Sequence, residues 1–255
     1  MMHHRFLWRT ASAQKRSIAP FRLLILFLSF LLSAAGGQPH KQWRIAHRGD
    51  RTLQHAARKL QDALQARGSA VKSASQLSSS LADRLALIVS PTDRPLDAIV
   101  VPPAVLQRSS QLKPEGYYLV NHNSTSMVLA ACPNGALYGS LELARQLLLG
   151  GPIVDTWVEG ARFSYRALKF NMPESPYRPG RATEIHAATV RSFEFWRSFL
   201  DMMAQNKFNV LSLWQLEPWQ YLIQPRHFPK AALPPRELQQ WRALYSFIFK
   251  EAQDR

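Results

Sequence analysis

The sequence predicts an α+β domain, with a mixed sheet and two helices, followed by two strand–helix units. Two segments before residue 160 repeat apolar residues at spacings of three and four, the pattern of an amphipathic helix. Short β-prone runs bounded by turn residues surround them, and strand-like and helical patterns alternate after residue 160. Hydrophobic residues make up 46% of the 255 residues and charged residues 19%, so the chain can bury a core.

Residues 1–37 have the order of a secretory signal peptide: basic residues without acids, an apolar run over 23–32, then the small residues 33–37. Ten residues at 1.5 Å each are too short for a hydrocarbon core of about 30 Å. We therefore expect cleavage near 35–37, export to the periplasm or the extracellular space, and no stable membrane span afterwards. An uncleaved signal anchor is the alternative, because the basic segment is long.

The net charge of +15 does not indicate nucleic-acid binding, because part of it belongs to the signal segment and the remaining Lys and Arg are scattered. The single Cys132 excludes a disulfide framework and a Cys-based zinc site, and His186 and His227 lack the spacing of metal ligands. Walker and Gly-x-Gly-x-x-Gly motifs are missing from the sequence. We expect no nucleic-acid partner, no metal and no cofactor.

The predicted N-terminal domain covers residues 38–160. Its two helices are expected at 51–67, ended by Gly68, and after Pro133, ended by Gly150. About five strands accompany them, at 42–47, 85–89, 117–120, 127–131 and 153–158, with the third and fourth forming a hairpin.

Two stretches of this domain are expected to lack regular structure. The Ser-rich residues 73–80 are typical of a loop. Residues 91–115 contain five prolines, which predicts an extended connection.

The remaining residues, 161–255, predict two strand–helix units. Strands are expected at 166–171 and 208–214, each followed by a helix, at about 190–206 and about 236–253.

Three pieces, in this order, resemble a known group of enzymes. The first consists of Glu115–Leu119, Met127–Ala131 and the run from Asn134 to Leu147; the second is Phe163–Asn171, and the third is Phe199–Trp214. Together they are similar to the non-catalytic, zincin-like N-terminal domain and the domain junction of β-N-acetylhexosaminidases of glycoside hydrolase family 20 and of α-glucuronidases. The third piece is similar to the first helix and second strand of their catalytic barrel.

The resemblance implies that residues 161–255 begin a (β/α)8 glycosidase barrel. Such a barrel needs about 200–250 residues, and 95 residues follow position 160. We therefore expect the first two βα units of a truncated TIM (β/α)8 barrel, from a fragment or an interrupted gene.

The sequence also departs from the family pattern. Arg166-Ala167 stands where the family has Arg-Gly, and Asn171 replaces the acid that ends the first strand. Residues 214–219 replace a polar, acidic stretch, which indicates a divergent branch.

Five residues are the candidate substrate-binding residues. Arg166 matches the family's sugar-binding Arg, and its planar fork of donors suits vicinal hydroxyls. The alternative is a structural Arg that is paired in the floor of the barrel. Trp214 and Trp219 can offer aromatic faces to sugar C–H groups or pack in a core. Glu217 and Asn171 lie at the same end of the strands and can bind hydroxyls or simply be solvated. The family's catalytic acid lies on a later strand, so no catalytic residue is assigned.

These observations predict the N-terminal portion of an exported carbohydrate-active glycoside hydrolase, which cleaves O-glycosyl bonds and is inactive as this chain alone. An exported, non-enzymatic carbohydrate-binding or interaction module is the alternative. A membrane-anchored envelope protein is the third hypothesis.

Overall fold

The computed structural model describes residues 42–47, 51–74, 84–89, 101–122, 124–172, 180–215 and 218–255. All of them belong to one compact unit, Lys41–Arg255. The predicted signal peptide, 1–37, lies outside the described residues. Within the described ranges, none of the helices combines the length and the apolar character needed to cross a membrane.

A mixed six-stranded sheet forms the N-terminal part of this unit, as the sequence predicts. Its strand order is β2-β1-β3-β5-β4-β6. Strands β1, β2, β3 and β5 run parallel, whereas β4 pairs antiparallel with both β5 and β6. The strands are β1 (Gln42–His47), β2 (Ala70–Ala74), β3 (Arg84–Val89), β4 (Tyr117–His122), β5 (Thr125–Ala130) and β6 (Thr156–Val158).

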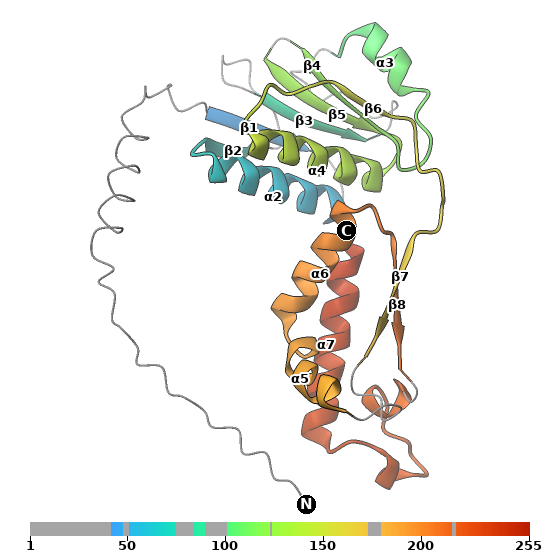
Figure 1. Cartoon of the computed structure of the whole chain (residues 1–255). Helices are drawn as coiled ribbons and strands as arrows, with labels where there is room; N and C mark the ends of the chain where they lie inside the picture. The colour runs from blue at the N-terminus through green and yellow to red at the C-terminus, as the bar shows by residue number, and fades with distance from the viewer. Residues whose placement is uncertain are drawn as a thin grey trace, which may run out of the picture. The chain divides into compact units, whose positions relative to one another are not determined.

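Two long helices, α2 (Arg51–Ala66) and α4 (Pro133–Leu149), lie side by side on one face of this sheet (Figure 1). Their apolar stripes bury leucines such as Leu60, Leu137 and Leu143 completely. The predicted helix ends are confirmed: Gly68 and Gly150 have φ angles of 75° and 81°, which glycine adopts without steric cost.

The hairpin of β4 and β5 is buried on both faces. Tyr117, Leu119, Val128 and Ala130 enter the core under α2 and α4. The residues between them, Tyr118, Val120, Met127 and Leu129, enter a second core on the opposite face. This alternation follows from the period of two along a strand.

The short helix α3 (Pro103–Ser109) covers part of that second face, where Val105 and Leu106 pack. The sequence prediction of two helices and an extended segment over 91–115 was wrong here. A Pro at the first helical position is compatible with a helix because its missing N–H has no partner there anyway.

Two strands also differ from the prediction. β2 includes residues 73 and 74, which were expected to be loop; this strand depends on its parallel pairing with β1, a long-range contact that local pattern does not report. β6 is shorter than expected, at three residues. Residues 75–80 of the Ser-rich stretch lie outside the described residues.

The second part contains β7 (Ala167–Asn171) and β8 (Val210–Trp214), which pair in parallel as a separate two-stranded sheet. Between them lie α5 (Arg181–Val190) and α6 (Phe193–Gln205), and α7 (Pro235–Gln253) follows β8. The helix predicted at about 190–206 is confirmed as α6, which is capped by Ser192, whose hydroxyl accepts from the Phe195 N–H. The preceding helix α5 was not predicted.

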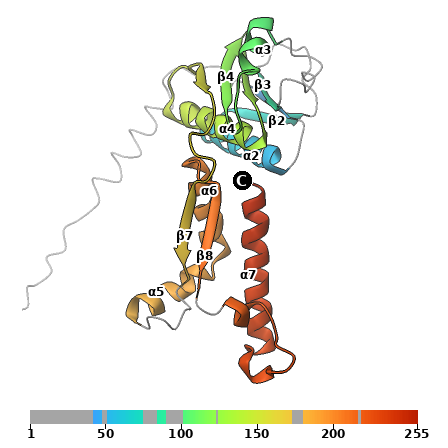
Figure 2. The same ribbon diagram turned by 90° about the vertical axis from the view of Figure 1, so that its right-hand side faces the viewer.

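An aromatic core joins these strands to the helices, which lie on one side of the β7–β8 ribbon in Figure 1; in the view turned by 90°, α6 overlaps β8 (Figure 2). Trp196 is fully buried, its ring centroid is 4.9 Å from that of Phe170, and its Nε1 donates to the Val190 carbonyl at 2.6 Å. This parallel β–α–β arrangement agrees with the predicted βα units; the truncated TIM (β/α)8 barrel remains a proposal.

A charged cluster ties α2 to the second part. Asp201 on α6 accepts from Lys59 Nζ at 2.6 Å and pairs with Arg255 at 2.7 Å, and His55 lies 3.4 Å away. Burial alone would raise the pKa of Asp201, but hydrogen bonds from His55 and Lys59 and the charge of Arg255 hold it well below its ordinary value.

Candidate functional site

The β7–β8 ribbon has one packed face and one open face. Phe170, Leu211 and Leu213 pack against the aromatic core. The alternate positions Lys169, Asn171 and Ser212 are exposed, and Trp214 is partly buried. The open face therefore carries polar and aromatic side chains that the fold does not use as core.

Asn171 and Trp214 are brought together at the carboxyl ends of the two strands, where they are direct partners in the register. In α/β folds with parallel strands, ligands bind at this end. The adjacent backbone is ordered by a hydrogen bond from the Met172 N–H to the Trp214 carbonyl, at 2.9 Å. Two of the five predicted residues thus share one edge.

Lys169 joins this edge and was missed by the sequence analysis. Its Nζ lies 4.8 Å from the ring centroid of Trp214, within the range of a cation–π contact. Among the described residues, Lys169 forms no ion pair. The period-two alternation of Ala-Leu-Lys-Phe-Asn was the signal that could have found it.

Trp219 lies in the 3-10 turn η1 (Pro218–Tyr221), just after β8, and its side chain is 42% exposed. Glu217 lies outside the described residues, so it stays a prediction. The described edge combines an ammonium, a carboxamide and indole rings. Such a set can stack on a sugar face and donate to its oxygens.

Arg166 lies at the opposite, amino-terminal end of β7. Its guanidinium pairs with Glu115 at 2.6 Å and donates to the Lys207 and Phe163 carbonyls, each at 2.5 Å. A further contact reaches the Tyr138 hydroxyl at 3.4 Å. These bonds connect β7 to the sheet part of the chain. The predicted role of Arg166 in substrate binding stays a prediction.

A small pocket of about 290 Å³ lies at this junction, lined by Glu115, Tyr138, Arg162, Arg166 and Lys207 among others. Burial and the nearby Glu115 raise the pKa of Tyr138, partly opposed by Arg166. Tyr138 is therefore a neutral hydroxyl here. The charges of Arg166 and Glu115 neutralise each other, which fits a structural ion pair better than a ligand-binding site.

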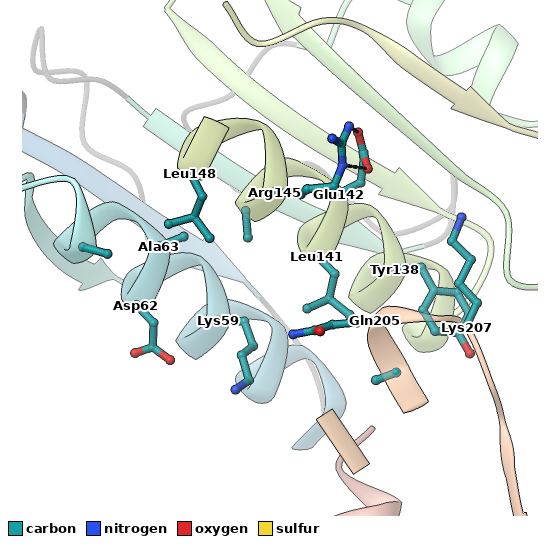
Figure 3. A pocket seen from close by; sticks show the side chains of 13 residues that line it. Lys59, Asp62, Ala63, Tyr138, Leu141, Glu142, Arg145, Leu148, Gln205 and Lys207 are labelled. Atoms are coloured by element: carbon teal, nitrogen blue, oxygen red, sulfur yellow. Dashed lines mark hydrogen bonds and ion pairs between the residues drawn. The ribbon is translucent and has the colours of Figure 1, made fainter. Parts of the chain in front are cut away.

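A larger groove of about 530 Å³ lies between α2, α4 and the end of α6. Figure 3 shows Leu141 and Leu148 pointing from α4 toward α2, whereas Glu142 and Arg145 turn away from α2. Those two residues bind each other, with the Arg145 nitrogens 2.9 and 2.7 Å from the carboxylate oxygens. The floor of the groove is formed by alanine and leucine side chains, and charged residues, among them Lys59, Asp62 and Lys207, also line it.

No cluster of three or more His, Cys, Asp or Glu residues with metal-ligand geometry occurs within the described ranges. At the carboxyl edge, residues 169–172 and 210–215 contain no acid. A glycosidase usually needs two carboxylates around the scissile bond. The described edge can bind but lacks a pair that could catalyse.

No protein-family model matches the sequence, and no curated protein matches it significantly.

Solved structures do resemble this fold. A GH138 enzyme targeting pectin rhamnogalacturonan II superposes with a TM-score of 0.62 at 18% identity, over 84% of this chain and 30% of that enzyme. The chain therefore spans less than a third of that enzyme's length. At this identity the likeness shows the fold alone, which is glycoside hydrolase-like.

Two further structures superpose less well. A GH115 4-O-methyl-α-glucuronidase with specificity for decorated arabinogalactans gives a TM-score of 0.46 at 13% identity, over 81% of this chain and 28% of that one. The GH20 chitobiase of Flavobacterium johnsoniae gives 0.47 at 15% identity, over 84% and 30%.

Proposed function

We propose that this chain is the N-terminal portion of an exported glycoside hydrolase and that the carboxyl edge of β7 and β8 is part of its sugar-binding surface. The proposal includes a (β/α)8 barrel of which these strands are the first two. The single observation that carries it is the open face of the ribbon, where Lys169, Asn171 and Trp214 meet at the carboxyl edge of a glycoside hydrolase-like fold.

The chemistry of this edge suits a carbohydrate. The indole of Trp214 offers an apolar face for sugar C–H groups, and the Asn171 carboxamide can both donate and accept. The ammonium of Lys169 suits oxygen-rich or anionic sugar groups. The fold neighbour that acts on pectin rhamnogalacturonan II makes oligosaccharides of that polysaccharide the first substrates to try.

Hydrolysis by this chain alone is not expected, because the described edge contains no acidic side chain. In this proposal the catalytic acid lies on a later strand of the barrel. The chain contributes substrate contacts rather than the acid–base pair.

Calorimetric titration of the full chain with oligosaccharides of pectin rhamnogalacturonan II tests the proposal. We expect binding, and Trp214→Ala should weaken it about 2- to 12-fold, the equivalent of 0.5–1.5 kcal/mol for an aromatic contact. Phe228→Ala is the control, because Phe228 is an exposed aromatic on a loop. Equal binding by wild type and Trp214→Ala would argue against this edge.

The alternative is an exported, non-enzymatic carbohydrate-binding or interaction module. Both functions predict binding, so hydrolysis separates them. Reducing-sugar release by the complete protein, lost when a strand-end acid is changed, supports the enzyme. Export itself is tested by N-terminal sequencing of the protein recovered outside the cytoplasm, where a start near residue 36 is expected.

A further inference from the structure

The groove between α2 and α4 exposes apolar side chains that the core does not use. Alanine and leucine side chains form its floor, and Leu148 is 58% exposed there. Leu149, the next residue of α4, is 72% exposed. Neither leucine belongs to the core beneath the two helices, so packing of the fold does not account for them. Single apolar side chains are normal on a protein surface, whereas a continuous apolar patch marks an interaction site.

The charged residues that line this groove leave one acid and one base without an ion pair. Lys59 is bound to an acid of α6 at 2.6 Å, and Arg145 is bound to Glu142 at 2.7 Å. Asp62 and Lys207 remain, and neither forms an ion pair with another residue in the described part of the chain.

These two unpaired charges lie on opposite sides of the apolar floor. Figure 3 shows Asp62 on α2 at one side and Lys207 at the other, with Leu141 and Leu148 between them. Such a strip is complementary to itself after a two-fold rotation about an axis in its own plane, because the rotation places each sign of charge opposite the other.

We propose that this groove is the centre of an interface between two copies of this chain, related by a two-fold axis. The aliphatic floors of the two copies face each other, and Asp62 of each copy faces Lys207 of the other. A standard interface buries about 800 Å² on each partner, so it also includes Leu149 and the exposed sides of α2 and α4 around the groove. The interface is separate from the proposed sugar-binding edge.

A sugar fits this groove less well than a second copy does. Sugar sites place aromatic faces and hydrogen-bonding groups against the ligand. The aromatic residue in the lining, Tyr138, is 3% exposed, and the floor is aliphatic. Homodimer interfaces, in contrast, combine an apolar centre with charged residues at the rim.

Sedimentation velocity of the full chain over a wide range of concentrations measures the association. We expect wild type to dimerise. Leu148→Arg places like charges at the centre of the interface and should raise the dimer dissociation constant by at least about 10-fold. Ile185→Arg is the matched control, because Ile185 is also 58% exposed but lies on α5, outside the groove. It should dimerise like wild type.

Exchange of the two charges tests the orientation of the copies. Asp62→Lys and Lys207→Asp should each weaken dimerisation about 2- to 30-fold, because every contact occurs twice in a two-fold dimer. The double variant restores both pairs with their signs exchanged and should dimerise like wild type. The φ angle of 61° at Lys207 is one that Asp tolerates, and damage to the fold does not produce such a rescue.

Three results would overturn the proposal. The first is a wild-type chain that stays monomeric at every concentration. The second is a dimer that Leu148→Arg and Ile185→Arg affect equally, which would place the contact elsewhere on the chain. The third is a double charge variant that associates no better than the single ones. Melting by circular dichroism verifies that each variant is folded, and if Leu148→Arg is not, the charge exchange decides alone.

Discussion

The two sheets of this protein differ in how many of their faces are buried. In the β4–β5 hairpin, residues on both faces enter a core, one under α2 and α4 and one on the far side. In the β7–β8 ribbon, one face packs against helices and the other stays open, with exposed Lys169, Asn171 and Ser212. A sheet buried on both faces has no surface left for a ligand, whereas a ribbon open on one face has.

This difference distinguishes a structural part from the part that we propose binds the sugar, although both consist of strands covered by helices. Glu115, which precedes β4, and Tyr138 on α4 lie next to Arg166, which connects the sheet part to β7. The ribbon then presents its carboxyl edge. We therefore expect core substitutions to act on stability and edge substitutions to act on binding.

The largest effect is expected from Trp196→Ala, in the core behind the ribbon. Trp196 is fully buried and packs on Phe170, and such a truncation costs about 3–5 kcal/mol. Denaturant unfolding of the full chain measures it. Trp219→Ala, at a half-exposed site, should change the free energy of unfolding by no more than about 0.5 kcal/mol; similar costs for both would break the comparison.

Asp201→Asn should lower the free energy of unfolding by about 1.5–3 kcal/mol, because it weakens charged hydrogen bonds from Lys59 and Arg255. The folded-state pKa of Asp201 lies below its ordinary value of about 3.9. Its contribution is therefore present above about pH 4 and is lost as the pH falls toward the folded pKa. Unfolding curves between pH 7 and pH 3 should show wild type losing stability faster than Asp201→Asn; parallel curves would contradict this.

Gly135→Ala probes the tight contact between α4 and the hairpin region. An added Cβ would meet the Gly116 carbonyl, a backbone atom that cannot rotate away, so we expect a cost of about 1–3 kcal/mol. Gly151→Ala is the control, since nothing lies within 4 Å of its added Cβ. Equal thermal midpoints for the two variants would show that the contact is looser than described.

The smallest effect is expected from Arg166→Lys. Lysine keeps the charge beside Glu115 but not the planar fork that also reaches the Lys207 and Phe163 carbonyls. We expect a loss of about 1 kcal/mol of stability, with oligosaccharide affinity unchanged. A fall in affinity of about 10-fold or more, with stability retained, would instead support the substrate-binding role that the sequence suggests.

Local pattern was sufficient for most of the elements. Apolar spacing and the glycines at 68 and 150 predicted α2 and α4, and turn residues predicted the hairpin. It failed for β2, which exists through pairing with β1, and for α3, where prolines around position 103 indicated extended chain. It also missed α5, which precedes the helix predicted at about 190–206.

The residues of the candidate site also fall into those that the sequence predicted and those that it missed. Asn171 and Trp214 were predictable because they end strands that the sequence itself marks. Lys169 required the knowledge of which face of the ribbon stays open. The residues next to Lys169 do not contain that information.

The sequence by itself determined most of the strands and helices, because the periods of 2 and 3.6 and the turn residues are local properties. The tertiary structure decided the others and how the elements are arranged. Parallel pairing of β7 with β8 placed Asn171 beside Trp214. The guanidinium of Arg166 was directed into the junction with Glu115 rather than toward the carboxyl edge. These arrangements depend on contacts between distant residues, whose geometry is fixed only when the helices and strands pack together.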